Sequence, residues 1–134
     1  MMFGQDSRYG SAASWSASAG PYDCYYSNKT PSWDAAGTAD DPSLDRDDRT
    51  GQGPENIRID TPSTTHAYTI GVHMYNNLAG SVEATVKLYY NNILMTTERR
   101  VFSSVKDLWV VGRVQFRSDR TCTYTRDGFV LNKP

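Results

Sequence analysis

The sequence contains few of the residues that build the commoner enzymatic and metal sites. Only two of its 134 residues are cysteine and two are histidine. A zinc site needs more nitrogen or sulfur ligands than these offer, so we expect His66 and His73 to be surface or hydrogen-bonded residues. No Gly-x-Ser-x-Gly motif marks a nucleophile. The absence of these signals predicts a protein that is not an enzyme.

The chain also lacks an excess of positive charge and a long apolar run. Its net charge is −1, which argues against a general nucleic-acid binder, and no stretch is apolar for long enough to cross a membrane. The first six residues lack the basic flank and apolar run of a secretion signal. If the protein is exported, its leader has been removed or the chain is a fragment. A subunit of an assembled particle, such as a virion, would need no leader.

The pattern that is present is typical of β-structure. Apolar and polar residues alternate with a period of two, which indicates half-buried strands. Asn91-Asn92 and Asp127-Gly128 are signals for tight turns. We therefore predict an all-β fold, an antiparallel β-sandwich or jelly roll with a long irregular acidic loop. Residues 1–21, rich in serine, alanine and glycine, are predicted to be a flexible arm before a single domain over 22–134. The expected strands are 56–59, 68–75, 84–90, 94–102, 108–116 and 121–124.

The segment 40–56 has the most unusual composition, because it holds six carboxylates in seventeen residues. Between residues 34 and 60 the charge is −5, whereas the remainder of the chain carries +4. Calcium takes six to eight oxygen ligands, so a bound Ca²⁺ ion would explain this crowding. The spacing does not fit an EF-hand, which would need glycine at position 50 and glutamate at position 56. The alternative is a solvated acidic loop that is partly neutralised by Arg46 and Arg49. The expected ligands are Asp45, Asp47 and Asp48, followed by Asp40, Asp41 and Glu55.

A set of motifs resembles a known family. They are Tyr22–Asn28, Pro31-Ser32-Trp33, the acidic run Asp41–Asp48, Gly51–Ile57 and Tyr68–His73. In order and spacing they are similar to a poorly characterised β-sandwich domain of bacterial exported proteins and lipoproteins, notably of myxobacteria. That family is itself similar in character to pre-peptidase C-terminal modules. The resemblance covers about residues 15–116 and implies an exported, non-catalytic module whose acidic loop holds calcium.

One feature of that family is not found in this sequence. The family opens with a strand of alternating aspartate and apolar residues that ends in histidine, and residues 3–10 do not show it. The first strand is then missing, remodelled or supplied by another chain. A module that borrows a strand could assemble into a polymer or particle by strand addition.

Aromatic and cysteine residues raise two further possibilities. Flat aromatic side chains stack on sugar rings, so a carbohydrate site is one interpretation of the irregular region, and packing at the end of the domain is the other. The residues concerned are Trp15, Tyr25, Tyr26 and Trp33, with Tyr22 beside them. Cys24 and Cys122 could form one disulfide that closes a long loop, or remain two buried thiols.

Together these features predict a calcium-binding structural or adhesion-type module. We expect it to act outside the cell, in the periplasm or at the cell surface, or as part of an assembled particle. A protein partner or self-association is expected, and a glycan is possible. The other functions considered are a carbohydrate-binding module and a self-assembling fibre or virion subunit.

Overall fold

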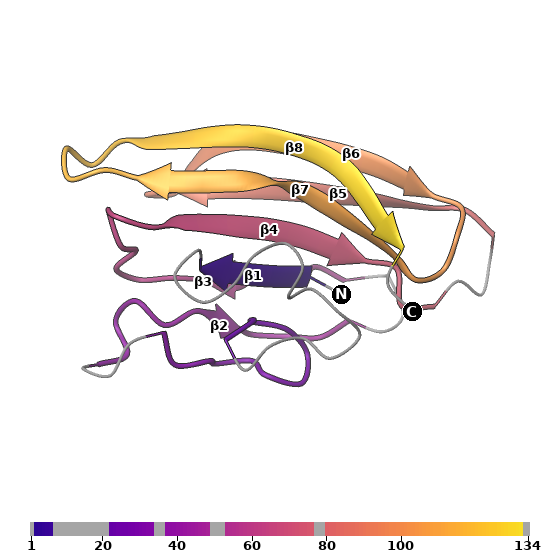
Figure 1. Ribbon diagram of the computed structural model, residues 1–134, viewed down its shortest axis with the longest axis horizontal. Coiled ribbons are helices and arrows are strands. Elements are labelled where there is room, and N and C mark those ends of the chain that lie inside the picture. Colours follow the sequence, from indigo (N-terminus) through magenta and orange to yellow (C-terminus); the bar gives the residue numbers. More distant parts are fainter. Residues whose placement is uncertain (1, 7–21, 34–36, 49–52, 77–79, 133–134) are drawn as a thin grey trace.

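The computed structural model describes residues 2–6, 22–33, 37–48, 53–76 and 80–132. Over these residues the fold is all-β, with antiparallel pairing throughout and no helix (Figure 1). None of them therefore forms a helix that could span a membrane. The strands are β1 (Met2–Asp6), β2 (Ser43–Leu44), β3 (Ile57–Arg58), β4 (Ala67–His73), β5 (Val82–Tyr90), β6 (Ile93–Phe102), β7 (Asp107–Phe116) and β8 (Cys122–Asn132).

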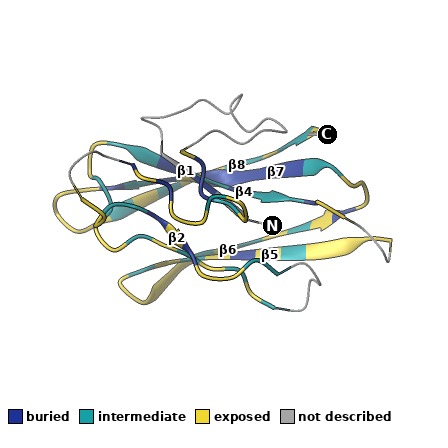
Figure 2. Cartoon of the chain, turned by 90° about the horizontal axis from the view of Figure 1, so that it is seen from below, coloured by how far each residue is buried: buried dark blue, intermediate teal, exposed yellow. Residues whose placement is uncertain are grey.

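A four-stranded sheet forms the first layer, in the order β1-β4-β7-β8. Strand β7 lies inside this sheet and holds more buried residues than any other described strand (Figure 2). Its pairing with β4 shifts between Ile70 and Gly71, and its pairing with β8 shifts between Val110 and Gly112. Val111 is skipped in both pairings and is the extra residue of a β-bulge. The side chains of β7 that belong to the two core clusters are Trp109 and Val111, up to this bulge, and Val114 and Phe116 after it.

The β5–β6 hairpin lies over the first layer and forms the core with it. Val86 of β5 and Phe102 of β6 cluster with Trp109 and Val111 of β7. Farther along β5, Leu88 and Tyr90 pack against a second core cluster. This cluster includes Tyr68 of β4 and Val114 and Phe116 of β7. The hairpin turn is formed by Asn91 and Asn92, whose φ angles are 49° and 64°. This confirms the tight turn that the Asn-Asn pair predicts.

The short pair β2–β3 lies near β1. A Cβ atom placed on Gly4 of β1 would be 3.5 Å from Cδ1 of Ile57 in β3. Gly4 also pairs with Cys24, through backbone hydrogen bonds of 3.1 and 2.9 Å. Two short strands and many turns therefore organise the region between residues 22 and 60, as its lack of periodicity predicts.

The structure differs from the sequence prediction at both ends of the chain. Residues 2–6, predicted to belong to a flexible arm, form edge strand β1, and Met2 pairs with Val72. The remainder of that predicted arm lies outside the described residues. Asp127-Gly128 is not a turn, because β8 continues through it. Gly128 has a φ of 72° and lies where the pairing with β7 is irregular, so the Asp-Gly signal marks a bulge within a strand.

The predicted disulfide is also absent. Cys24 and Cys122 are both free thiols. Cys24 pairs with β1 at one edge of the four-stranded sheet, and Cys122 lies in β8 at the opposite edge. From Cys24 through β1, β4 and β7 to β8 there are four strand spacings, which amount to about 19 Å across a sheet, whereas a disulfide needs Cα atoms within about 7 Å.

Candidate functional site

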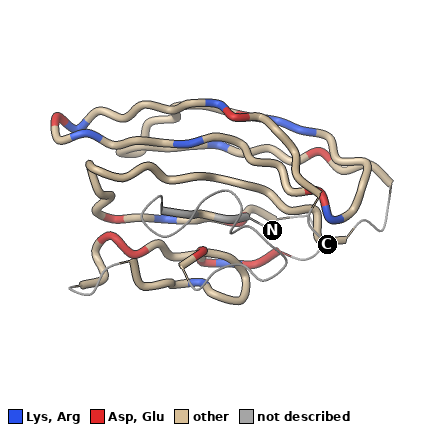
Figure 3. The backbone as a smooth tube through the Cα atoms, in the orientation of Figure 1, with Lys and Arg blue, Asp and Glu red and all other residues tan. Residues whose placement is uncertain are grey.

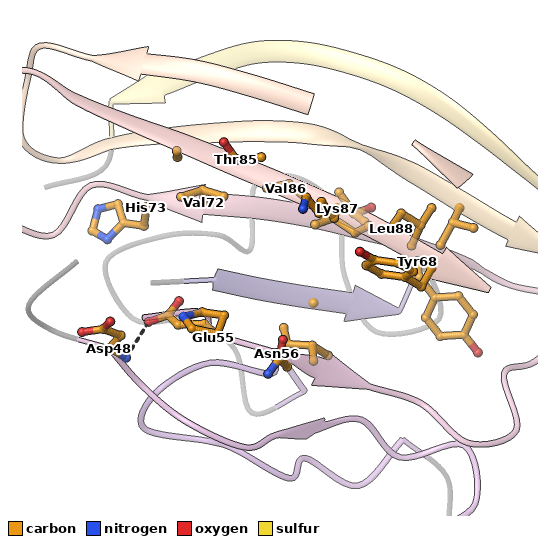
Figure 4. Close-up of a pocket in the computed structure, with 18 of the residues that line it drawn as sticks. Asp48, Glu55, Asn56, Tyr68, Val72, His73, Thr85, Val86, Lys87 and Leu88 are labelled. Atoms are coloured by element: carbon orange, nitrogen blue, oxygen red, sulfur yellow. Dashed lines mark hydrogen bonds between the residues drawn. The ribbon is translucent and has the colours of Figure 1, made fainter. Parts of the chain in front are cut away.

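A large groove opens beside strand β5. It has a volume of about 1340 Å³ and lies between β5, the inner face of β4 and the segment 53–60 (Figure 4). Apolar side chains of β4 and β5 line it together with carboxylates from the acidic segment. The groove is therefore a long, open site with an apolar interior and a polar wall.

The groove lies beside β4, between β5 and β3. Strand β6 lies over β8, because Arg100 donates from Nη1 to the carbonyl oxygen of Gly128 at 3.1 Å and Arg126 pairs with Glu98 at 3.0 Å. Strand β5 lies over β7, and β3 lies over β1. Of the described strands, none covers β4 between β5 and β3.

The floor of the groove is formed by β4. Ile70 and Val72 are only half-buried, although both pack against the core cluster beneath β5. At one end Tyr68 is buried and stacks on Trp33, with ring centroids 5.3 Å apart. The Tyr68 hydroxyl also accepts a hydrogen bond from the Ser63 amide at 2.6 Å. The closed end is thus rigid, whereas the apolar middle of the floor is partly open to water.

The acidic wall is built by hydrogen bonds between carboxylates and backbone amides. Glu55 accepts from the Asp48 amide at 3.0 Å, a contact shown in Figure 4, and the Asp48 carboxylate accepts from the Gly53 amide. Burial raises the pKa of the Glu55 carboxyl, and a hydrogen bond with the Asp47 side chain raises it further. Figure 3 shows how acidic residues gather in the layer that holds β2 and β3.

The six predicted metal ligands are not brought together in one cluster. Asp47, Asp48 and Glu55 line the groove. Asp41 instead accepts a hydrogen bond from the Trp33 amide at 2.7 Å. Asp45 is exposed and accepts from both the backbone and side-chain amides of Asn56, at 3.3 and 2.9 Å.

Asp40, the remaining predicted ligand, is half-buried. Across the described ranges, no three histidine, cysteine, aspartate or glutamate side chains are arranged to hold a metal ion. Calcium binding therefore stays a prediction. The carboxylates that remain candidates for it are those that line the groove, of Asp47, Asp48 and Glu55.

Among the predicted sugar-stacking residues, Trp33 was assigned wrongly. Its side chain is 0% exposed, and its indole nitrogen donates to the carbonyl oxygen of Tyr22 at 2.7 Å. A ring that is packed on both faces cannot stack on a sugar. Tyr26 is 47% exposed and meets the half-buried Tyr25 edge to face at 5.4 Å. Trp15 lies outside the described residues.

The ring of His66 takes part in a local network of hydrogen bonds. Nδ1 of His66 lies 2.9 Å from the hydroxyl oxygens of both Ser63 and Thr65. All three residues belong to one turn between β3 and β4, in which the Ser63 hydroxyl also accepts from the Thr65 amide at 3.2 Å. This is the local hydrogen bonding expected of serine and threonine in turns.

Sequence reasoning missed the groove itself. Its walls come from strands that are distant in the sequence, and alternation within one strand does not show which strands become neighbours. The alternation of 68–74 and 84–90 did identify the residues of the floor and of one wall, but not the space between them.

Comparison with known proteins adds nothing to this description. No family model, curated protein or solved structure matches the chain. The resemblance of the loop motifs to a bacterial exported domain therefore stays a prediction, and the function has to be argued from the groove.

Proposed function

We propose that the chain is an incomplete β-sandwich that serves as a non-enzymatic structural or adhesion-type module, binding another polypeptide in the groove. The observation that carries this proposal is the position over β4 that no described strand covers. A β-sandwich normally buries its inner faces against each other, yet Ile70 and Val72 remain half-exposed there. Long apolar grooves with a polar wall are typical of binding sites for other molecules.

An unbiased selection of peptides tests the proposal. Random peptides displayed on phage would be selected against the wild-type protein and then tested against Val72→Arg, which places a long charged side chain on the groove floor. The matched control is Val101→Arg, because Val101 is 59% exposed on the hairpin β5–β6. We expect Val72→Arg to lose the selected peptides and Val101→Arg to retain them, with both variants showing a cooperative melt.

Two outcomes would contradict the proposal. One is a selection that yields no binder, and the other is a set of binders that the two variants retain equally. Glu55→Gln is the second groove variant should Val72→Arg not fold, since glutamine can still accept the hydrogen bond from the Asp48 amide.

Calcium binding by the same wall is a second candidate. The observation that favours it is the contact between the Asp47 and Glu55 side chains, which raises the pKa of Glu55. A divalent cation would relieve the repulsion between two ionised carboxylates, and oxygen ligands suit calcium. Such an ion would make the acidic segment rigid by drawing these carboxylates together.

Thermal melts with calcium and with a chelator test this second candidate. Binding only to the folded state stabilises it by about 2.7 kcal/mol when the free ion exceeds its Kd a hundredfold. We expect the wild-type midpoint to fall by several degrees on chelation and Asp47→Asn to show no such difference. Asp119→Asn, which changes an exposed carboxylate in the β7–β8 turn, should respond as the wild type does. Identical melts of the wild type in both buffers would rule calcium out.

A further inference from the structure

The turn end of the β5–β6 hairpin exposes large apolar side chains. In this hairpin tip, residues 89–95, the exposed fraction is 54% for Tyr89, 65% for Ile93, 48% for Leu94 and 43% for Met95. Ile93, Leu94 and Met95 do not belong to the lining of the groove, so the hairpin tip is a second surface. Neighbouring apolar side chains exposed in this way mark a contact with another protein or with a membrane.

The apolar side chains of the hairpin tip point to both of its faces. Tyr89 is paired with Leu94, and Tyr90 with Ile93. Paired residues share a face, and successive residues alternate between faces. Tyr90 faces inward, because its ring packs on that of Phe116 with centroids 5.0 Å apart. Tyr89 and Leu94 are therefore on the outer face and Ile93 on the inner one. A folded partner would cover one face, whereas the fluid interface of a bilayer surrounds both.

Cationic side chains lie beside the hairpin tip. The contact between Tyr90 and Phe116 joins the last residues of β5 and β7, so the β7–β8 turn, residues 117–121, lies next to the tip. This turn exposes Arg117 and Arg120, and Lys87 is exposed on β5 just before the tip. Within the described ranges no ion pair joins these three cations to a carboxylate.

Most of the negative charge lies at the other edge of the molecule. The one carboxylate of the β7–β8 turn, Asp119, accepts hydrogen bonds from the amide and hydroxyl of Thr121 at 2.9 and 2.6 Å. Residues 34–60 carry a charge of −5, against +4 in the remainder of the chain. They include β3, which packs on β1 at one edge of the four-stranded sheet, whereas the turn leads into β8 at the opposite edge (Figure 3). The hairpin tip therefore lies on the positive side of the molecule.

From this arrangement we infer that the hairpin tip and the β7–β8 turn dock the protein on a lipid bilayer with anionic headgroups. Ile93 and Leu94 enter the boundary between headgroups and acyl chains, where the amphipathic ring of Tyr89 is also favoured. Arg117 and Arg120 then face the anionic headgroups. The buried apolar area and the attraction to anionic lipid add up in such binding.

Vesicle flotation tests the inference. The full chain is mixed with vesicles of phosphatidylcholine alone, or of phosphatidylcholine and phosphatidylserine in equal parts, at low and at physiological salt. We expect binding to the mixed vesicles and affinity about tenfold lower or worse for phosphatidylcholine alone. The difference should shrink as salt screens the charges.

Variants of the apolar side chains locate the contact. Ile93→Ser combined with Leu94→Ser should weaken binding to the mixed vesicles by about tenfold or more, because both side chains lose their apolar contact. Val101→Ser is the matched control, since Val101 is 59% exposed at the far end of β6, and it should bind as the wild type does. Met95→Asp replaces the double variant if that variant does not melt cooperatively.

Two further variants test charge and insertion. Arg120→Gln should weaken binding to the mixed vesicles by about fivefold. Lys29→Gln removes the same charge from an exposed residue beside β2 and should leave the affinity unchanged. Leu94→Trp should gain fluorescence that brominated lipid quenches, with the wild type measured in parallel as the background of the native tryptophans.

Three results would overturn the inference. The first is no binding to either kind of vesicle. The second is binding that the tip variant and Val101→Ser retain equally, or that Lys29→Gln weakens as much as Arg120→Gln does. The third is a dimer of the wild-type protein in sedimentation that the tip variant dissociates, because a second copy would then cover the hairpin tip. None of these results bears on peptide binding in the groove, which Val72→Arg tests separately.

Discussion

At the scale of single residues, Gly112 in the middle of β7 is a tightly packed position. A Cβ atom placed there would lie 2.5 Å from the backbone oxygen of Thr125 and 2.7 Å from the ring of Tyr124. Tyr124 lies across the strand pair, and its hydroxyl donates to the carbonyl oxygen of Val111 at 3.3 Å. Glycine is therefore needed because neighbouring atoms fill the space that any side chain would occupy.

We expect Gly112→Ala to destabilise the fold by about 1 to 3 kcal/mol, the usual cost of forcing extra volume into a packed site. The Tyr124 ring can shift, but the Thr125 oxygen belongs to the backbone of β8 and cannot. Chemical denaturation would measure the change in the free energy of unfolding. Gly37→Ala is the control, since nothing lies within 4 Å of its added Cβ, and it should stay within about 0.5 kcal/mol of the wild type. Equal stability of the two variants would contradict the packing argument.

Burial decides the chemistry of the two thiols. Cys24 is fully buried, and burial raises its pKa to about 12. Cys122 is half-buried, and its pKa is also raised by burial. A thiol with a raised pKa carries little thiolate at neutral pH and reacts slowly. The cysteines therefore contribute to packing, which is one of the two interpretations that the sequence allowed.

At the scale of elements, the acidic segment is held by its own carboxylates. The Asp45 side chain bridges back to Asn56, so the ends of the segment are tied where β2 and β3 begin to pair. The amide of the Asn56 side chain lowers the pKa of Asp45 from its usual 3.8, and backbone amides lower it further. Part of the negative charge that suggests an ion is thus used to accept hydrogen bonds within the loop.

The hydrogen bonds that the Asp45 carboxylate accepts predict that the stability of the fold depends on pH. Because the pKa of Asp45 is lower in the folded state, its ionised form stabilises the fold above the unfolded value of 3.8. That contribution is lost as the pH falls through the folded pKa. We expect Asp45→Ala to melt at a lower temperature than the wild type at neutral pH, and the two midpoints to converge in strong acid.

Thermal melts across the acid range measure this convergence. Asn56→Ala is the matched control, because it removes the main donor and should lose the same pH-dependent contribution. A difference between Asp45→Ala and the wild type that stays constant down to strong acid would mean that the carboxylate stabilises the loop in some other way.

Local sequence patterns predicted the elements well where the alternation was regular. The central parts of β4 to β7 and the Asn91-Asn92 turn were all expected. Strand β7 was placed correctly, but both alternating sets of its first half are buried, Leu108 and Val110 as well as Trp109 and Val111, so alternation alone does not show which pair joins the cluster with Val86 of β5. A bulge sets which pair faces the core, and its position depends on the pairing with β4 and β8.

At the scale of the whole molecule, the fold class could be predicted and the neighbours of each strand could not. The order β1-β4-β7-β8 joins segments that are distant in the sequence, and alternation carries no information about such pairings. The groove has β5 on one side and β3 on the other, so it depends on which strands become neighbours. For the same reason the candidate site was predicted in part, through Asp47, Asp48 and Glu55 but without the apolar floor.

The position of β1 has a consequence for the order of folding. The hairpins β5–β6 and β7–β8 close through short turns, and hairpins form within microseconds. Among the described strands β1 instead has β4 as its neighbour in the sheet, which joins residue 2 to residue 72, and closing so long a loop is slow. During synthesis β1 therefore emerges well before β4 and must wait for that strand before it can pair.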